Sequence, residues 1–460
     1  MLLARQIGPE IYGLYGMTVI AIGLITIITD FGLSAAYIGS EKNTEGHLWL
    51  VIVANTCAAL IISLLFYKFS VSILNLIDFK ISDSVLVIIF LCVLLKGITI
   101  GPEAKLQKKL KFKILNIIEL GSYFFAYGGV AIVMVYMGYK DLALFVALLL
   151  QLLMKLLLSW AVSKPLDEVR YNFEVVKSMF HYGFGLTLGK VANYLSNQGD
   201  QILIAKFLGI KAVGYYGRSF QLAIMPINML GQALDKVLFP VLADFKKTGG
   251  DIYFYYIKAI AMVSLFAFPL SLYLYIVGDN VVILLLGNEW GVAAEIFPIM
   301  VLSMVFRLSN KITDSFLRAI GYVYQRAVLQ WLFVVNITLA VTLTYKAGLF
   351  EIVKALFIVG IINSSLLMLL LLKKINESAL RVFKIWLEAL LLMLPVFIIM
   401  HMSSIYLLQI NGGFMYIVLM ALIWFVLVIA VILLRSKIRF KTDIGIEIDR
   451  IKSHKLVFLH

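Results

Sequence analysis

The sequence predicts an all-α polytopic membrane protein that is built from two pseudo-symmetric helical bundles. Its 460 residues are 62% hydrophobic and only 14% charged, and their mean hydropathy is +0.99. Soluble globular domains are less apolar and carry more charge. Apolar runs of about twenty residues, each long enough to cross the hydrocarbon core of a bilayer, recur along the whole chain. An internal repeat indicates the two bundles.

One motif occurs twice in the chain. Ala4–Gly16 aligns without gaps on Ala205–Gly217, 201 positions later, with five of thirteen residues identical, and Gly13 falls on Gly214. Two copies in the same order predict a duplicated bundle, a common plan of transporters whose substrate site lies between the repeats. The predicted helix 181–203 precedes the second copy of the motif. When the same offset of 201 positions is applied to it, nearly all of the matching helix in the first half would lie before the first residue. We therefore expect the first helix of a fourteen-helix plan to be missing: the chain is truncated or mis-started, or its first half works with one helix fewer.

Hydropathy predicts thirteen membrane helices, which would be helices two to fourteen of that plan. The connections between them are short, and none is long enough to hold a soluble domain. The predicted spans are 11–39, 46–70, 82–101, 114–137, 141–163, 179–208, 212–241, 252–277, 293–320, 323–346, 350–372, 381–406 and 413–434.

Lysine and arginine gather in every second loop, and this pattern orients the chain. The loop between the spans that end at 101 and begin at 114 contains five lysines. The side with these loops is predicted to be cytoplasmic and to include the C-terminus, whereas Arg5–Tyr12 faces outward. Topology and contact with membrane lipids thereby account for most of the net charge of +14, which argues against nucleic acid as a partner.

These patterns divide the chain into five parts. An N-terminal helical bundle without helix one is expected over 1–163, and a cytoplasmic loop over 164–178 connects it to a C-terminal bundle over 179–374. Two additional membrane helices over 375–435 and a cytoplasmic tail over 436–460 follow.

The helices around the second copy of the motif carry polar stripes, which a helix surrounded by lipid has no reason to keep. An ionisable side chain left in lipid costs roughly 2.5–3.5 kcal/mol, so these groups must pair or line a wet cavity. Glu119 and Lys155 lie at similar depth and are expected to form a structural ion pair. Candidates for ion coupling are Asp30, Asp200 and Asp314, although pairing of each with a neighbouring cation is the simpler explanation. The residues predicted to line a substrate cavity are Lys190, Asn197, Asp200, Arg218, Gln221, Arg307 and Lys311.

Six cationic and four anionic side chains lie well inside the predicted spans. This excess of positive charge suits an anionic cargo such as a diphosphate-linked lipid or an acidic sugar chain. The sequence contains no HExxH, GxxxxGK[ST], GxSxG or CxxC motif, and its five histidines have no ligand spacing. We therefore expect no enzyme activity, no cofactor and no metal. Cys57 and Cys92 lie in apolar spans and are expected to be small buried hydrophobic residues.

Four stretches at matching spacing resemble one family: Ala4–Gly16, Thr29–Ile38, Gly101–Phe112 and above all Asn193–Phe245. The resemblance is to bacterial polysaccharide flippases of the colanic-acid and teichuronic-acid exporter type, within the multidrug/oligosaccharidyl-lipid/polysaccharide exporter superfamily. It extends from the first residue to about residue 374, and beyond that only hydropathy matches.

This resemblance implies two six-helix lobes that form a V, followed by two C-terminal helices. It also implies alternating access for an undecaprenyl-diphosphate-linked oligosaccharide, in a cavity lined by helices one, two, seven and eight. Asp200 and Arg218 fall in the matching signature and are expected in that cavity. Lys190 departs from the family, which more often has a small residue there.

Two other functions stay open. A cation-coupled multidrug exporter of the same superfamily would share the fold. Such pumps export mostly cationic drugs, so several cations in the predicted cavity argue against this function. A membrane glycan polymerase or ligase would need a carboxylate-bearing loop or domain at the surface. The preferred prediction is a flippase of the bacterial inner membrane, whose partners are a lipid-linked oligosaccharide, membrane lipids and other proteins of surface-polysaccharide assembly.

Overall fold

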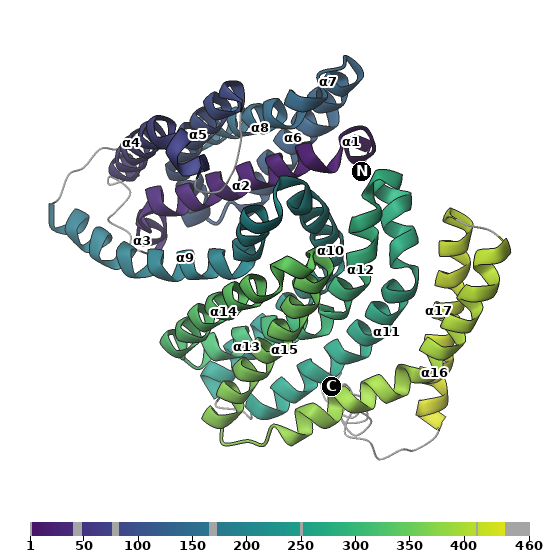
Figure 1. The fold of residues 1–460 in the computed structure, drawn as a ribbon. Helices are drawn as coiled ribbons and strands as arrows, with labels where there is room; N and C mark the ends of the chain where they lie inside the picture. The colour runs from purple at the N-terminus through teal and green to yellow at the C-terminus, as the bar shows by residue number, and fades with distance from the viewer. Residues whose placement is uncertain are drawn as a thin grey trace. The chain divides into compact units, whose positions relative to one another are not determined.

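The structure, a computed structural model, describes residues 2–39, 48–75, 82–164, 173–248, 252–410 and 413–437, and within these ranges it is helical (Figure 1). The elements of the first half are α1 (Leu2–Gln6), α2 (Pro9–Asp30), α3 (Leu33–Gly39), α4 (Leu48–Asn75), α5 (Asp83–Lys108), α6 (Phe112–Tyr123), η2 (Phe124–Ala131), α7 (Ile132–Tyr136), α8 (Lys140–Ser163) and α9 (Phe173–Leu208). Those of the second half are α10 (Ile210–Thr248), α11 (Ile252–Leu286), η3 (Asn288–Trp290), α12 (Gly291–Leu302), α13 (Met304–Ala319), α14 (Val323–Thr344), η4 (Tyr345–Ala347), α15 (Leu349–Lys374), α16 (Leu380–Ile410) and α17 (Phe414–Lys437).

Ten of the described helices are long and apolar enough to span a membrane, or up to eleven if the bent pair α12–α13 counts as one span. A helix satisfies its own backbone hydrogen bonds, as a lipid environment requires. The long helices α9 and α10 are not among the ten, and both carry the polar stripes. The prediction of an all-α polytopic membrane protein is confirmed, while the number of thirteen spans stays a prediction.

Three predicted spans are interrupted helices. The span 11–39 divides into α2 and α3 because Phe31 and Gly32 have left-handed backbone conformations (φ 45° and 68°). The span 293–320 bends by 47° between α12 and α13. The span 114–137 consists of α6, the π-helical segment η2 and α7. Hydropathy averages over a window of about nineteen residues, so it does not detect such local changes.

The chain divides into two compact units, Met1–Gly214 and Tyr215–His460. In the first unit α5 packs against α4 and α8, and α8 packs against α6 (Figure 1). Buried residues of these helices, among them Ile89, Cys92 and Phe145, form a core. The long helix α9 packs along α2 and α3 in the same unit.

Two lysines at the end of α5 bind carbonyl groups at the ends of neighbouring helices. Lys105, only 7% exposed, donates a hydrogen bond to the carbonyl oxygen of Lys164 (2.7 Å), directly after α8. Lys108 donates to the carbonyl oxygen of Tyr37 in α3 (3.0 Å), and its Nζ lies 4.5 Å from the centroid of the Tyr37 ring. The last carbonyl groups of a helix lack intrahelical partners and carry partial negative charge, so an ammonium group stabilises them.

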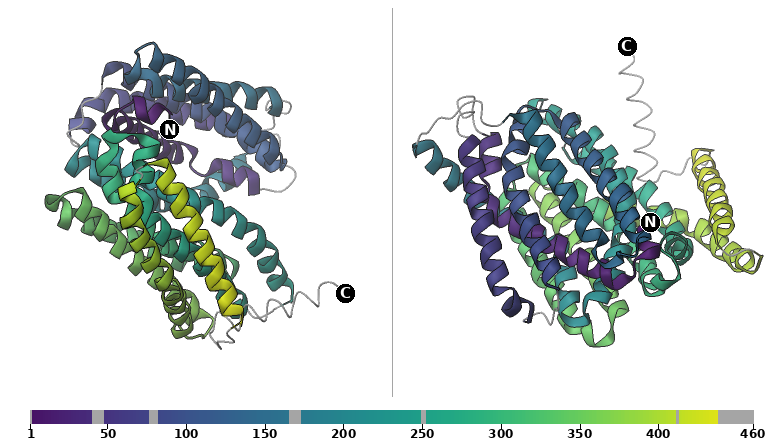
Figure 2. Two further views of the ribbon diagram at one scale, coloured as in Figure 1. Left: turned by 90° about the vertical axis from the view of Figure 1, so that its right-hand side faces the viewer. Right: turned by 90° about the horizontal axis from the view of Figure 1, so that it is seen from above.

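In the second unit α11 is the central helix. It packs against α12, α13, α16 and α17, and the surrounding core includes Tyr256, Phe316 and Trp386. The helices α16 and α17 also contact each other (Figure 2). Trp424 of α17 donates a hydrogen bond to the carbonyl oxygen of Pro269 in α11 (3.0 Å). The two additional membrane helices are thus packed onto the core of this unit.

The predicted division at 164–178 stays a prediction. The division by contacts falls later, after Gly214, because α9 contacts α2 and α3. Most of the predicted inter-lobe loop (165–172) and nearly all of the predicted tail (438–460) lie outside the described residues.

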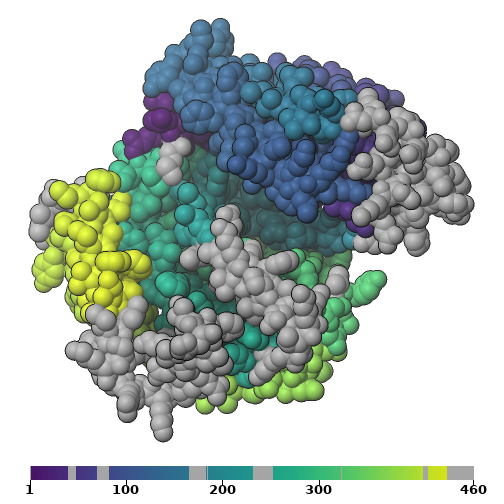
Figure 3. Space-filling view, turned by 180° about the vertical axis from the view of Figure 1, so that it is seen from behind, coloured from purple at the N-terminus to yellow at the C-terminus, as the bar shows by residue number. Residues whose placement is uncertain are grey.

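The helices α6 and α8 expose large apolar side chains, and their segment is blue in Figure 3. Leu120, Phe124 and Leu157 are 68%, 78% and 60% exposed, as suits helices that contact lipid. Cys57 of α4 is also exposed, so its expected burial is wrong, whereas Cys92 is buried as expected. A membrane helix buries only the face that packs on other helices, and Cys57 lies on another face of α4.

Candidate functional site

The turn between α2 and α3 lies against α9 at two glycines. A Cβ atom at Gly32 would overlap the carbonyl oxygen of Gly183, and one at Gly183 would overlap the carbonyl oxygen of Phe31. Gly32 also has a positive φ of 68°, which only glycine adopts without steric cost. The two backbones therefore approach as closely as glycine allows, and this approach brings polar side chains of α2 and α9 together.

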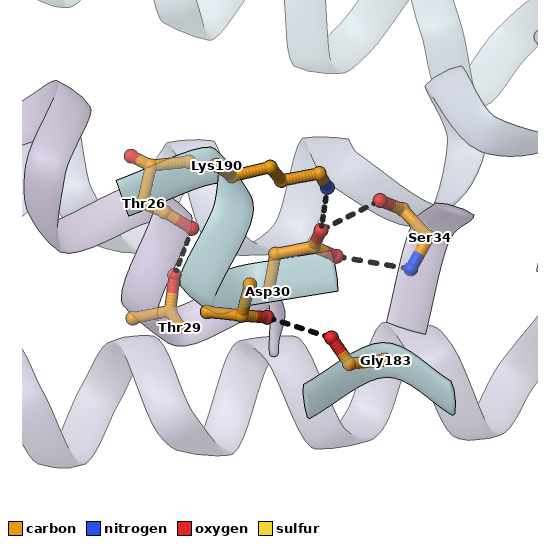
Figure 4. A network of polar contacts seen from close by, with 7 residues as sticks. Thr26, Thr29, Asp30, Ser34, Gly183 and Lys190 are labelled. Atoms are coloured by element: carbon orange, nitrogen blue, oxygen red, sulfur yellow. Dashed lines mark hydrogen bonds and ion pairs between the residues drawn. The ribbon is translucent and has the colours of Figure 1, made fainter. Parts of the chain in front are cut away.

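Asp30, the last residue of α2, accepts hydrogen bonds from both sides of this contact (Figure 4). Its Oδ1 accepts from the backbone N–H of Ser34 (3.0 Å), and its Oδ2 accepts from the Ser34 hydroxyl group (2.7 Å). The Lys190 ammonium group of α9 donates to the same Oδ2 (3.0 Å). The Asp30 side chain is only 7% exposed, and a carboxylate buried to this extent needs donors and a cation to stabilise its charge.

A cavity of about 210 Å³ adjoins this ion pair. Its polar lining includes two carboxylates and one ammonium group, so it is less favourable for an anion than for water or a cation. The lining residues are Thr26, Ile27, Asp30, Ser34, Ile100, Glu103, Ala104, Gln107 and Lys190.

One of the two carboxylates, Glu103, belongs to a second polar cluster inside unit 1. Lys155 of α8 pairs with Glu103 of α5 (3.1 Å) and with Glu119 of α6. Gln151 donates a further hydrogen bond to Glu119 (3.2 Å). The predicted ion pair between Glu119 and Lys155 is thus confirmed. The cluster connects three helices. Lys155 pairs directly with both of its carboxylates, and Lys96 of α5 is a second cation near them.

The two copies of the repeated motif contact each other through matching residues. A Cβ atom at Gly13 would overlap the carbonyl oxygen of Ile210, and one at Gly214 would overlap that of Pro9. Pro9 and Ile210 are themselves a matching pair, since 210 − 9 and 214 − 13 both equal 201. The contact is therefore reciprocal: each helix places the carbonyl group of its first residue against the glycine of the other.

Between its two ends, α2 also contacts the middle of α9. The hydroxyl group of Tyr194 donates to the carbonyl oxygen of Ile20 (2.8 Å), and a Cβ atom at Gly23 would overlap the Tyr194 ring. α2 is thus in contact with α9 or the first turn of α10 at its beginning, in its middle and at its end.

In the second unit, Arg307 of α13 contacts a hydroxyl group of its own helix start and an aromatic ring of α10. Its Nε donates to the Ser303 hydroxyl oxygen (3.1 Å), and its Cζ lies 4.8 Å from the centroid of the Phe220 ring in α10. Among the residues that the structure describes, no carboxylate pairs with it. A ring face attracts a cation without using its N–H groups, so the contacts within the described ranges leave most of the five donors of this group to a ligand.

Three more predicted cavity residues lie on α10 and α13. Arg218 donates a hydrogen bond to Gln221, one turn later on α10. Lys311 of α13 reaches Gly231 of α10, where a Cβ atom would overlap its Nζ. Together with Arg307, these side chains place three cations on two adjacent helices.

The remaining predicted residues have local partners. Asp314 pairs with Arg318 (3.3 Å) and with Arg326 of α14. Like Asp30, which pairs with Lys190, it thus has a neighbouring cation. Asp200 is 6% exposed and accepts from the backbone N–H of Gln201 (2.8 Å). Asn197 donates to a backbone carbonyl of its own helix (2.7 Å). A role in ion coupling, and a single cavity lined by residues of both units, stay predictions.

Ser34, Glu103 and Phe220 did not stand out in the sequence. Ser34 follows Asp30 by four residues, a spacing that would have suggested a contact had the break in the span 11–39 been recognised. Glu103 lies just beyond the predicted end of the span 82–101, and Phe220 resembles any core aromatic residue. Nowhere in the described ranges do three or more His, Cys, Asp or Glu side chains form a group that could hold a metal ion.

The family described as "Polysaccharide biosynthesis protein" matches residues 2–295. This chain belongs to that family. Similar members include the teichuronic acid biosynthesis protein TuaB of Bacillus subtilis (strain 168), 27% identical over 299 residues, which are 64% of this chain and 61% of TuaB. The lipopolysaccharide biosynthesis protein WzxC of Escherichia coli (strain K12) is 23% identical over 67% of this chain and 63% of WzxC. The matches thus span about six tenths of these curated relatives.

Two solved structures share the fold of this polysaccharide biosynthesis protein. The lipid II flippase MurJ, in an inward closed conformation, matches with a TM-score of 0.74 at 14% identity, over 95% of this chain and 96% of MurJ. A multidrug resistance MATE family transporter of the MOP superfamily, in an inward-facing conformation, matches with a TM-score of 0.62 at 14% identity, over 81% of this chain and 93% of the transporter. Both are polytopic helical proteins, which agrees with the fold class.

Proposed function

We propose that this protein is a flippase, not an enzyme, and that it moves a polyprenyl-diphosphate-linked oligosaccharide from the inner to the outer leaflet for surface polysaccharide synthesis. The proposal includes alternating access between two lobes, 1–163 and 179–374, in the bacterial inner membrane with the C-terminus in the cytoplasm. Membership of a polysaccharide biosynthesis family supports the cargo class. One relative, ExoT of Rhizobium meliloti (strain 1021), is named a succinoglycan biosynthesis transport protein.

The observation that carries the proposal is the environment of Arg307. A cation inside a membrane protein is costly unless it is paired or solvated, and no carboxylate of the described residues pairs with this one. Within the described part of the chain, Arg307 is held by a ring and a hydroxyl group, which leave most of its N–H donors available. A diphosphate offers the oxygens that a guanidinium group binds best, so we assign Arg307, with Arg218 and Lys311 nearby, to the cargo headgroup.

A multidrug exporter is the second candidate, because this chain also shares the fold of a MATE family transporter. Such a protein would bind mostly cationic drugs, and three cations on α10 and α13 disfavour them. If the protein exports drugs, cells that lack it become more sensitive to cationic dyes while their surface polysaccharide stays unchanged. If it is the flippase, the surface polysaccharide is lost and drug sensitivity is unchanged.

The direct test uses purified protein in liposomes that contain a fluorescent lipid-linked oligosaccharide. We expect transfer of the label between leaflets with the wild-type protein. With Arg307→Ala or Arg218→Ala, we expect transfer at low cargo concentration to fall by about tenfold or more, because each variant removes a charge-assisted hydrogen bond of roughly 1.5–3 kcal/mol.

Lys354→Ala is the matched control, because Lys354 is an exposed cation of the same unit that pairs with Glu351 (2.6 Å). It should leave transfer unchanged. Absence of transfer with folded wild-type protein would contradict the flippase proposal. Equal activity of all three variants would contradict the assignment of the cationic residues.

A further inference from the structure

The ion pair between Asp30 and Lys190 is asymmetric. Asp30 is 7% exposed and also receives two hydrogen bonds from Ser34, so it keeps donors when Lys190 leaves. The Lys190 side chain is 39% exposed, and it carries a point charge on a flexible stem. Of the two partners, Lys190 is therefore the one that can exchange.

The charges around the pair determine from which side an anion can approach Lys190. The adjoining cavity contains Asp30 and Glu103, and Glu103 is itself tied to Lys155 (3.1 Å). An anion is repelled by these carboxylates, so the cavity itself is a poor route for an anion to Lys190. A diphosphate carries more negative charge than one carboxylate and competes with Asp30 for the ammonium group.

We propose that Lys190 is a switching residue, which pairs with Asp30 while no cargo is bound and with the cargo diphosphate when cargo enters. This proposal rests on the flippase function above and adds its trigger: the cargo headgroup itself releases the polar contact between α2 and α9.

The consequence for α2 follows from its three contacts. Once Lys190 leaves, the end of α2 loses its ionic contact with α9, while the close approach of the two backbones at Gly32 and Gly183 remains. The reciprocal contact at Gly13 and Gly214 is made by backbone carbonyl groups and does not involve Lys190. Cargo binding therefore loosens one end of α2 and leaves the other in place, which is the asymmetry that alternating access needs.

The test is the affinity of the purified full chain for undecaprenyl diphosphate, with undecaprenol as the comparison ligand that lacks the phosphates. Asp30→Asn removes the competitor of the diphosphate, so we expect binding to tighten by about fivefold (about 1 kcal/mol). Lys190→Ala should weaken binding by a similar factor. The double variant should bind like Lys190→Ala, because Asp30 acts only through Lys190. Lys206→Ala, an exposed cation later on α9, should bind like the wild type.

A merely structural ion pair predicts a different result, in which Asp30→Asn and Lys190→Ala change affinity in the same direction or not at all. That result would overturn the proposal. If Asp30→Asn does not fold, Ser34→Ala takes its place. It removes the hydroxyl donor of Asp30 and leaves the backbone N–H, so Asp30 depends more on Lys190. Binding should therefore weaken, and unchanged binding would again overturn the switch.

The two proposals fail in distinguishable ways. If the wild-type protein transfers cargo and binds the diphosphate better than the alcohol, but Asp30→Asn does not tighten binding, only the switch is wrong. If the wild type neither transfers cargo nor prefers the diphosphate, the flippase function itself is wrong.

Discussion

The reciprocal contact of the repeated motif predicts that Gly13→Ala destabilises the protein. The new methyl group would overlap the carbonyl oxygen of Ile210, and this oxygen belongs to the first turn of a helix and cannot rotate away as a side chain does. Overpacking of this kind costs about 1–3 kcal/mol. Replacement of a helical glycine by alanine otherwise adds up to about 1 kcal/mol of stability, so the steric cost should exceed the gain.

Gly16→Ala is the control that isolates this steric cost. Gly16 lies one turn further along α2, and a Cβ atom added there would have no neighbouring atom within 4 Å. Both variants gain helix propensity, so the difference in stability between them reports the clash alone. In thermal unfolding of the detergent-purified protein, followed by intrinsic fluorescence, Gly13→Ala should melt below the wild type and Gly16→Ala at or above it.

Equal melting temperatures of the two variants would refute the close approach of α2 and α10. The matching variant Gly214→Ala supplies an independent check, because its methyl group would overlap the carbonyl oxygen of Pro9. It should melt below the wild type as well. The double variant should lose less than the sum of the single losses, since one separation of the helices relieves both clashes.

Two further predictions concern cations inside the predicted spans. Lys155→Ala removes the cation that pairs directly with both Glu103 and Glu119 and should destabilise the protein by up to about 3–5 kcal/mol, seen as a sharp fall in folded protein after detergent extraction. Adding Glu103→Gln and Glu119→Gln should recover much of the loss, and no recovery would show that Lys155 acts through packing. Phe220→Leu removes the ring beside Arg307. It should weaken binding of undecaprenyl diphosphate about two- to fivefold, because a cation–π contact contributes about 0.5–1 kcal/mol. The thermal stability of the variant is the control and should match that of the wild type.

Hydropathy predicted the membrane helices and the depth of side chains along them. Glu119 and Lys155 were matched by depth alone, and they do pair. Glu103 shares the same lysine but was missed, because α5 continues to Lys108 and the predicted span ended at 101. The depth of a residue in the membrane follows from its distance along the helix from the helix end. It can therefore be inferred from the sequence wherever that end is predicted correctly.

The contact between Asp30 and Lys190 could not be predicted in the same way. Both residues were identified as candidates, but for different roles, and they lie 160 positions apart. Their pairing depends on how α2 and α9 are rotated about their axes, which the backbone contact at Gly32 and Gly183 determines. Spacing within one helix contains no information on that rotation, although the repeated motif did single out Gly13 and Gly214.

The lysines that bind helix ends have a consequence for experiments on orientation. Substituting basic loop residues is the usual way to ask which side of a bilayer a segment faces. At Lys105 and Lys108 such a change would also remove a hydrogen bond to the terminal carbonyl groups of α8 and α3, so an altered orientation could not be separated from damaged folding. Lys111 and Lys113, both exposed, are the positions in this loop where a reversed charge would report on insertion.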